Sequence, residues 1–356
     1  MRKKYVDFAR EIALFYMFFQ HGVLTVLKQS ENAGVIFFLN EIVPFCSALF
    51  LFLAGYSIVL SLKKNGVSSY NLHNFTHLIK RGVVLCAASS VLFFIENGFQ
   101  TPDIFLTSGI LNTIGIFIII SSVFLFIPHR RIFFTIFTIS ATIVYVYFDL
   151  KETYFVPFNY GYEPIFPTIL FGFIGITFGL FADRIEEKSK LEKAFYLCAA
   201  LVGVVIHLAF SFKHGFLKVF FTEFGRYTVE RIFSEKYLFS SLFYGGREYS
   251  DFQALIWNFR TNSFFAALGS TFFLIGSLYF MEPFFKKYLP KKIFIPGKYA
   301  FINYFYHLAI LAILTQTSGF NSLGKYQFLT LLVSLFIGSY IISYIAEFIT
   351  KPKKTI

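Results

Sequence analysis

Long runs of apolar residues recur along the whole chain, separated by shorter polar stretches. A helix needs about 20 apolar residues to cross the hydrocarbon layer of a membrane, so runs of this length predict transmembrane helices. The pattern predicts ten such spans, at residues 6–27, 35–62, 80–96, 106–127, 131–149, 164–183, 194–212, 262–281, 298–317 and 326–350. We therefore expect an all-α, polytopic membrane protein in which residues 1–356 form a single integral-membrane domain.

The basic residues concentrate in alternate connections between these spans. If the N-terminus lies inside, 22 of the 32 Lys and Arg residues fall on the cytoplasmic side, which is the bias typical of membrane topology. The charge pattern therefore predicts a multi-pass protein of the inner (plasma) membrane with both termini inside. Although the formal net charge is +12, this distribution argues against a basic face that binds nucleic acid.

The longest connection, residues 213–261, mixes aromatic and basic residues. That composition predicts short interfacial helices on the extracytoplasmic face rather than a disordered linker. Two interpretations stay open for this segment. It is either a lid or acceptor-binding surface, or a scaffold loop at the level of the lipid headgroups.

The first predicted span carries polar side chains that a bilayer disfavours, namely Asp7, Arg10, Glu11 and His21. A charged group inside a span costs several kcal/mol, so it usually has a function. Arg10 and His21 are eleven residues apart, which places them on one face of a helix and about 16 Å apart along its axis. This geometry suits an elongated ligand with its reactive end at His21. The alternative is an ion pair of Arg10 with Asp7 or Glu11, together with a histidine that only packs.

Other sources of chemistry are weak in this sequence. It contains no phosphate-binding glycine loop, no nucleophile elbow and no HExxH motif. The cysteines stand in apolar segments at unrelated spacings, which predicts neither a metal site nor a disulfide framework. His73 and His77 have a spacing of four residues in the connection before the third span, where we expect a solvated loop rather than a metal site.

Several segments resemble the membrane-bound acyltransferase-3 family. DFAREIALFYMFFQH (7–21) is similar to the opening motif of that family, with Glu11 where a small residue is common. VPFCSALFLFLAGYSIVLS (43–61) resembles its second-span signature, and IKRGVVLC (79–86) resembles the basic start of its third span.

Other segments are closer to the related bacterial homologues of the heparan-α-glucosaminide N-acetyltransferase. These segments are GILNTIGI (109–116) and FPTILFGFIGITFGLFADR (166–184). The chain departs from that group at Asn112 and Thr113, where the group tends to have Gln-Arg. GKYAFINYFYHLAIL (297–311) resembles a late span of both groups, so the resemblance covers most of the chain.

The resemblance implies a membrane-bound acyltransferase. Such proteins move an acyl group, usually acetyl, from cytoplasmic acyl-CoA to a carbohydrate or glycolipid acceptor across the bilayer. It implies acetyl-CoA or another acyl-CoA as donor, with membrane lipids as surroundings, and the absence of metal-binding motifs predicts no metal. His21 would act as the base that takes a proton from the acceptor, or as a transient acyl carrier. Arg10 would hold the CoA phosphates, and Lys80 and Arg81 would complete that anion site unless they serve only as helix-end anchors.

A second polar cluster lies in the ninth predicted span. His307 follows Tyr304 by three residues, so both share one helix face. The resemblance makes His307 a catalytic candidate and Tyr304 and Asn303 candidates for acceptor binding, against an ordinary packing role. On the outer side, Glu41 and Glu163 are further acceptor-binding candidates, against plain solvation at helix ends.

Two other classes of function remain open from the residues alone. A transporter or flippase for a lipid-linked or small polar substrate also keeps charges inside its spans, but many such proteins show inverted repeats, and none is visible in this sequence. A non-catalytic partner in a glycan-assembly complex is the other class. The identity of the acceptor, O- versus N-acylation and the oligomeric state are not encoded in any motif of this chain.

Overall fold

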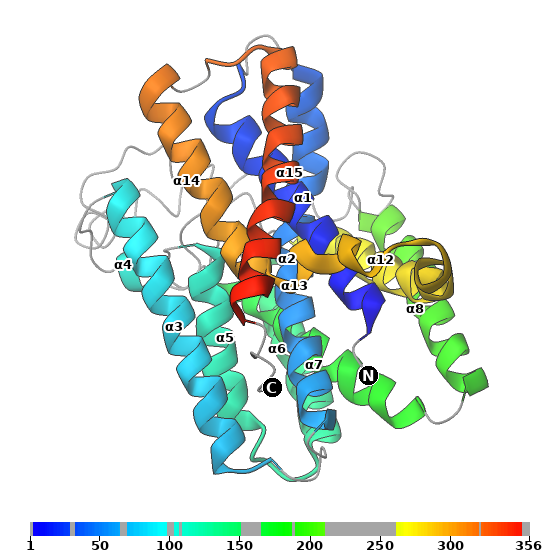
Figure 1. Cartoon of the computed structure of the whole chain (residues 1–356). Coiled ribbons are helices and arrows are strands. Elements are labelled where there is room, and N and C mark those ends of the chain that lie inside the picture. The colour runs from blue at the N-terminus through cyan, green and yellow to red at the C-terminus, as the bar shows by residue number, and fades with distance from the viewer. Residues whose placement is uncertain are drawn as a thin grey trace, which may run out of the picture. The chain divides into compact units, whose positions relative to one another are not determined.

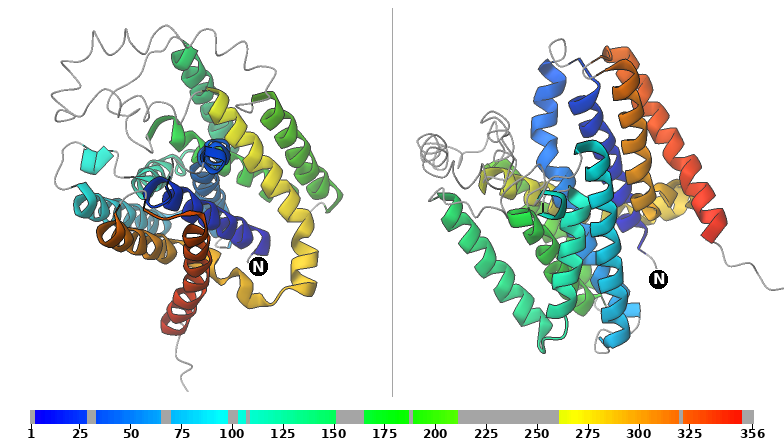
Figure 2. Two further views of the ribbon diagram at one scale, coloured as in Figure 1. Left: turned by 90° about the horizontal axis from the view of Figure 1, so that it is seen from above. Right: turned by 90° about the vertical axis from the view of Figure 1, so that its left-hand side faces the viewer.

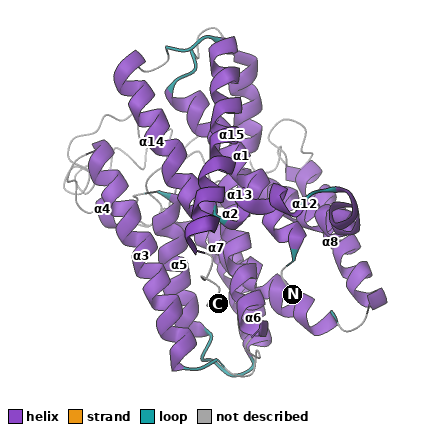
Figure 3. Ribbon diagram, in the orientation of Figure 1, coloured by secondary structure: helices purple, strands orange, loops and turns teal. Residues whose placement is uncertain are grey.

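The computed structural model describes residues 3–28, 33–64, 70–97, 103–106, 109–150, 165–186, 189–210, 261–319 and 322–350. Throughout these segments the chain is helical with short connecting loops, as Figure 3 shows. The single β-bridge in the described part pairs Leu27 with Leu323. The fold is therefore all-α, as the sequence predicts.

Each of the ten predicted spans coincides with one long helix (Figure 1). These helices are α1 (Lys4–Thr25), α2 (Ala33–Lys64), α3 (Leu72–Asn97), α5 (Ile110–Phe124), α6 (Arg130–Leu150), α7 (Ile165–Ile185), α8 (Ser189–Phe210), α12 (Thr261–Tyr288), α14 (Ala300–Ser318) and α15 (Lys325–Thr350). The short helices are α4 (Asp103–Leu106), η4 (Lys291–Phe294) and α13 (Ile295–Lys298).

Eight helices of the described segments are long and apolar enough to cross a membrane. The other two predicted spans correspond to α1, which carries Asp7, Arg10 and Glu11, and to α5, which is only 15 residues long. On α6 the exposed apolar side chains recur every three to four residues, as on a helix face turned to lipid; they are Ile132, Ile136, Ile139 and Ile143. The protein is thus a polytopic membrane protein.

Two predicted boundaries differ from the helix ends by about seven residues or more, and one of them is the end of the eighth span, expected at residue 281, whereas α12 ends at Tyr288. The third span was expected to begin at residue 80, but α3 begins at Leu72. His73 and His77 therefore lie on exposed turns of a helix rather than in a loop. The helix extends further because the polar residues before the apolar run are compatible with a helix that continues beyond the membrane.

The described chain divides into two compact units. Residues 1–46 and 273–356 form unit 1, and residues 47–272 form unit 2. The boundaries fall inside α2 and α12, so each of these helices contributes to both units.

In unit 2, α2 and α7 approach each other backbone to backbone. A Cβ atom on Gly55 would overlap the carbonyl oxygen of Gly172, and one on Gly175 would overlap that of Phe52. Small residues permit such close packing between membrane helices. These glycines belong to segments 43–61 and 166–184, so two of the motifs that resemble known families are packing elements.

The helices α3 and α5 of unit 2 lie side by side and run in opposite directions (Figure 2). Their contact again depends on glycine, because a Cβ atom on Gly82 would meet the carbonyl oxygen of Gly115 at 2.8 Å. Near one end of this pair the hydroxyl of Tyr70 donates a hydrogen bond to the carbonyl of Ser122. Burial raises the pKa of Tyr70 to about 12, so this hydroxyl remains a donor.

In unit 1, α1 packs on α13, α14 and α15. A Cβ atom on Gly297 of α13 would overlap the carbonyl oxygen of Asp7, so α13 and α1 touch backbone to backbone. Near its start, at Asp7, α1 contacts Gly297, which lies just before α14. Near its end, at His21, α1 contacts His307 of α14, so α1 and α14 run in the same direction. This agrees with their places as the first and ninth of the predicted alternating spans.

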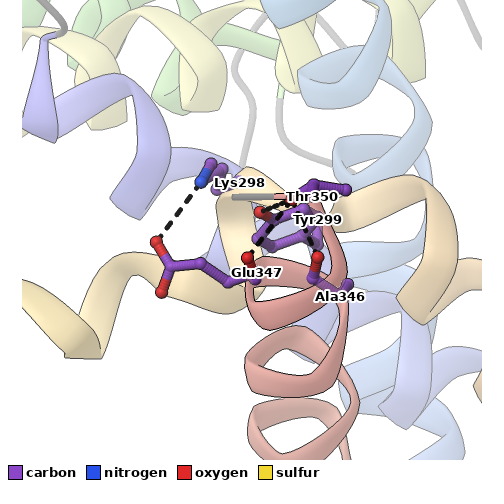
Figure 4. Close-up of polar contacts among 5 residues, drawn as sticks. All are labelled: Lys298, Tyr299, Ala346, Glu347 and Thr350. Carbon is purple, nitrogen blue, oxygen red and sulfur yellow. Dashed lines mark hydrogen bonds and ion pairs between the residues drawn. The ribbon is translucent and has the colours of Figure 1, made fainter. Parts of the chain in front are cut away.

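The last turn of α15 is held against the junction of α13 and α14 (Figure 4). The ammonium of Lys298 lies 3.4 Å from the carboxylate of Glu347. Because the Thr350 hydroxyl donates to the carbonyl of Ala346, the Tyr299 hydroxyl donates to Thr350, at 2.9 Å. The Tyr299 hydroxyl, followed by Glu347, raises the pKa of Lys298, which keeps this exposed end of the helix pair charged.

Candidate active site

Two histidines meet in unit 1. The Nδ1 atom of His21 on α1 lies 2.9 Å from the Nε2 atom of His307 on α14, a hydrogen-bond distance. Their rings stack at an interplanar angle of 29°, with centroids 5.1 Å apart. His307 is fully buried, and His21 is half-buried. The imidazole of His21 is thus turned toward α14, and the two predicted catalytic histidines form one pair.

Aromatic rings surround this pair. Tyr304, one turn before His307, presents its ring edge-on to His307 at 5.3 Å and to His21 at 6.4 Å between centroids. Phe18 of α1 packs against His307 at a centroid distance of 5.0 Å. Tyr304 is therefore in the site, where it touches both imidazoles, and its contacts fix the planes of the rings.

Asn303 lies on the same face of α14 as His307. Its side chain is fully buried, and its amide nitrogen donates to the hydroxyl of Ser343, at 2.8 Å, and to the carbonyl of Pro296, at 3.2 Å. The amide oxygen has no hydrogen-bond partner in the described residues. The backbone carbonyl of Asn303 lies 3.2 Å from the Nδ1 atom of His307. Asn303 is thus adjacent to the pair through its backbone, while its side chain ties α14 to α15.

The charged residues at the start of α1 form two separate interactions. Arg10 forms an ion pair with Asp7 at 2.7 Å. Glu11 is buried, and one of its carboxyl oxygens is hydrogen-bonded by the hydroxyl of Tyr340, which also lies 3.0 Å from the carbonyl of Ile293. The ion pair between Arg10 and Asp7 that sequence reasoning considered is therefore present. Because Arg10 is half-buried rather than fully buried, its guanidinium keeps some exposed surface.

The remaining predicted residues are not brought together with the histidine pair by any contact the structure describes. Lys80 and Arg81 are exposed on α3, which belongs to unit 2, whereas Arg10 belongs to unit 1. Glu41 lies within α2, but its side chain is outside the described residues. Glu163 and nearly all of the long connection 213–261 lie outside them as well.

Sequence reasoning missed two residues of α15, Tyr340 and Ser343. They fasten Glu11 and Asn303, so they shape the surroundings of the site without touching the histidines. The available signal was the spacing of three residues between them, which puts both on one face of an otherwise apolar helix. In the described part of the chain, no group of His, Cys, Asp and Glu side chains is arranged to hold a metal ion.

Comparison with known proteins identifies a family to which the chain is similar. A comparison with curated proteins found no matching relative. The family model of the heparan-alpha-glucosaminide N-acetyltransferase catalytic domain matches residues 2–211. The match includes α1 with His21 and ends before α14 with His307. Of the two groups that the sequence resembles, this is the second, and the likeness to the acyltransferase-3 family remains a resemblance.

The match covers more than half of the chain. The matched segment contains α1 with its polar residues and the helices from α2 to α8. The chain belongs to the heparan-alpha-glucosaminide N-acetyltransferase catalytic-domain family and is an acetyltransferase-like membrane protein.

Proposed function

We propose that this protein is an acyl-CoA-dependent acyltransferase of the inner membrane. It transfers an acyl group, normally acetyl, from cytoplasmic acyl-CoA to a hydroxyl or amine of a carbohydrate or glycolipid at the extracytoplasmic side. Membership of an acetyltransferase family supports the reaction class. The single observation that carries the assignment of a site is the hydrogen-bonded pair of His21 and His307 between two helices of an apolar protein.

The chemistry follows from the properties of imidazole. Histidine is the side chain whose ordinary pKa suits proton transfer near neutral pH. His21 takes the proton of the acceptor as that group attacks the thioester carbon, or it carries the acyl group transiently. Burial of His307 and the apolar helices around the pair favour either role, because a site with little water would protect the acyl group from hydrolysis.

The donor and the acceptor are assigned to opposite ends of the first helix. Arg10 lies about 16 Å from His21 along the axis of α1, a length comparable to that of the pantetheine arm of CoA. Arg10 holds the CoA phosphates in this proposal, with Lys80 and Arg81 as further cations. Glu41 and Glu163 remain acceptor-binding candidates on the outer side, and Tyr304 and Asn303 remain acceptor-binding candidates next to the histidine pair. Of these, Tyr304 is the best supported, because it touches both imidazoles.

Purified full-length protein in detergent tests this function. It is incubated with labelled acetyl-CoA and an extract of envelope glycans and glycolipids, and mass analysis identifies the labelled product. We expect acyl transfer by the wild-type protein and its loss in His21→Ala. His207→Ala is a matched control, because His207 also lies in an apolar helix and is hydrogen-bonded, through Nδ1, to the hydroxyl of Ser270 at 2.8 Å.

Two results would contradict the proposal. Transfer at the normal rate by His21→Ala would remove His21 from the chemistry. Failure of the wild-type protein to bind any acyl-CoA would favour a transporter or flippase instead.

A further inference from the structure

A line of three groups runs through the site from the backbone of α14 to α1. The carbonyl oxygen of Asn303 lies 3.2 Å from the Nδ1 atom of His307. The Nε2 atom of the same ring lies 2.9 Å from the Nδ1 atom of His21. His307 thus uses both ring nitrogens inside the protein, and its side chain is fully buried.

These contacts determine where the ring protons lie. A carbonyl oxygen only accepts hydrogen bonds, so the Nδ1 atom of His307 carries a hydrogen and donates it to Asn303. A neutral imidazole has one such hydrogen, which leaves a lone pair on the Nε2 atom of His307. This lone pair accepts from His21, so the Nδ1 atom of His21 carries the hydrogen. The lone pair of His21 is then on its Nε2 atom, which no described hydrogen bond occupies.

We propose that His307 is a positioning residue that holds His21 in the tautomer with a basic Nε2 atom, directed by the carbonyl of Asn303. The inference rests on the proposed acyl transfer. It assigns the Nε2 atom of His21 as the reacting nitrogen and removes His307 from direct contact with the substrate. The family match ends at residue 211 and assigns no role to His307.

The transfer step balances with this assignment. The Nε2 atom of His21 takes the hydrogen of the acceptor hydroxyl or amine while the acceptor atom forms a bond to the thioester carbon. The carbon–sulfur bond breaks, and the electron pair leaves with the sulfur. During this step the Nδ1–H group of His21 keeps its hydrogen bond to the Nε2 atom of His307. This hydrogen bond stabilises the imidazolium that His21 becomes. The Nε2 atom of His21 then returns the proton to the thiolate, giving free CoA and a neutral ring.

Two variants of His307 separate positioning from packing. In His307→Leu the leucine has a volume similar to that of histidine but offers no hydrogen-bond acceptor to His21. In His307→Gln the side-chain oxygen of the glutamine can accept the hydrogen bond from His21 at about the same place. We expect His307→Leu to lower kcat about 10²-fold or more with little change in KM for acetyl-CoA. The fall of its kcat/KM on acidification should occur at lower pH than in the wild type, because the imidazolium of His21 has lost its acceptor. His307→Gln should restore much of kcat and of the wild-type profile.

Nitrogen-15 NMR of the histidine-labelled full-length protein provides a readout that does not depend on activity. The chemical shifts distinguish protonated from bare ring nitrogens, and His21→Ala and His307→Leu assign the signals. We expect protonated Nδ1 and bare Nε2 atoms in both rings of the wild-type protein. A His21 ring protonated at Nε2, or equal losses of kcat in His307→Leu and His307→Gln, would overturn the inference. If the expected tautomers are present but the wild-type protein transfers no acyl group, the proposed function fails while the proton arrangement stands.

Discussion

His21 and His307 are separated by 286 residues in the chain, and their ring nitrogens lie 2.9 Å apart. The contact joins the polar first helix to a helix near the C-terminus, so the two polar clusters recognisable in the sequence form one site. This relationship connects the proposed chemistry to residues outside the segment that matches the acetyltransferase family.

The proposed role of Arg10 in binding CoA can be tested by comparing it with Asp7, the residue with which it forms an ion pair. If its guanidinium holds CoA phosphates, Arg10→Gln removes a charge-assisted contact and raises KM for acetyl-CoA about 10- to 100-fold, with kcat nearly unchanged. The control Asp7→Asn breaks the same ion pair but keeps the cation. It should leave KM within about threefold of the wild-type value. Steady-state kinetics in detergent make the comparison, and equal increases in KM for both variants would mean that Arg10 acts only through the ion pair.

The hydroxyl of Tyr340 should matter for stability. Tyr340→Phe leaves the buried carboxyl group of Glu11 without this partner, which costs about 1–3 kcal/mol. We expect the thermal unfolding midpoint in detergent to fall by several degrees. Tyr326→Phe is the control on the same helix, because Tyr326 is 83% exposed. An unchanged midpoint for Tyr340→Phe would show that the contact with Glu11 contributes no net stability.

The contact between α2 and α7 depends on Gly55. Gly55→Ala forces a Cβ atom into the carbonyl oxygen of Gly172, so the helices must move apart. The expected loss of stability is about 1–3 kcal/mol. Gly324→Ala is the matched control, since the nearest atom to its Cβ, in Gln327, would be 3.8 Å away. The stability of the two variants is compared through the fraction of protein that elutes as a single folded species in size-exclusion chromatography. Equal fractions for the two variants would refute the packing argument.

The side chain of Asn303 should act on stability rather than on proton transfer. Its amide donates to Ser343, whereas only its backbone carbonyl faces His307. A double-mutant cycle with Asn303→Ala and Ser343→Ala should give a coupling free energy of about 1 kcal/mol from unfolding midpoints. Because Asn303→Ala keeps the carbonyl, the pH profile of kcat/KM should stay that of the wild type. A shifted profile would mean that the amide itself takes part at the site.

The sequence predicted the helices well because each one depends mainly on the residues of a single segment. A run of about 20 apolar residues makes a membrane helix wherever it occurs. The site was predicted in part. His21 stood out because imidazole and charge are rare in a span, and His307 stood out through the resemblance of residues 297–311. Ser343 did not stand out because serine hydroxyls usually bond within their own helix, and Tyr340 did not stand out because it is one of 22 tyrosines in the chain.

By itself the sequence determined that this is an all-α membrane protein with an unusually polar first helix. Only the tertiary structure decided which polar groups of distant segments meet: His21 with His307, and Glu11 with Tyr340. The physical reason is that a membrane helix is apolar on the sides that face lipid and on the sides that face other helices. Its pattern therefore specifies neither its rotation nor its depth, and the backbone contacts at residues such as Gly297 set both.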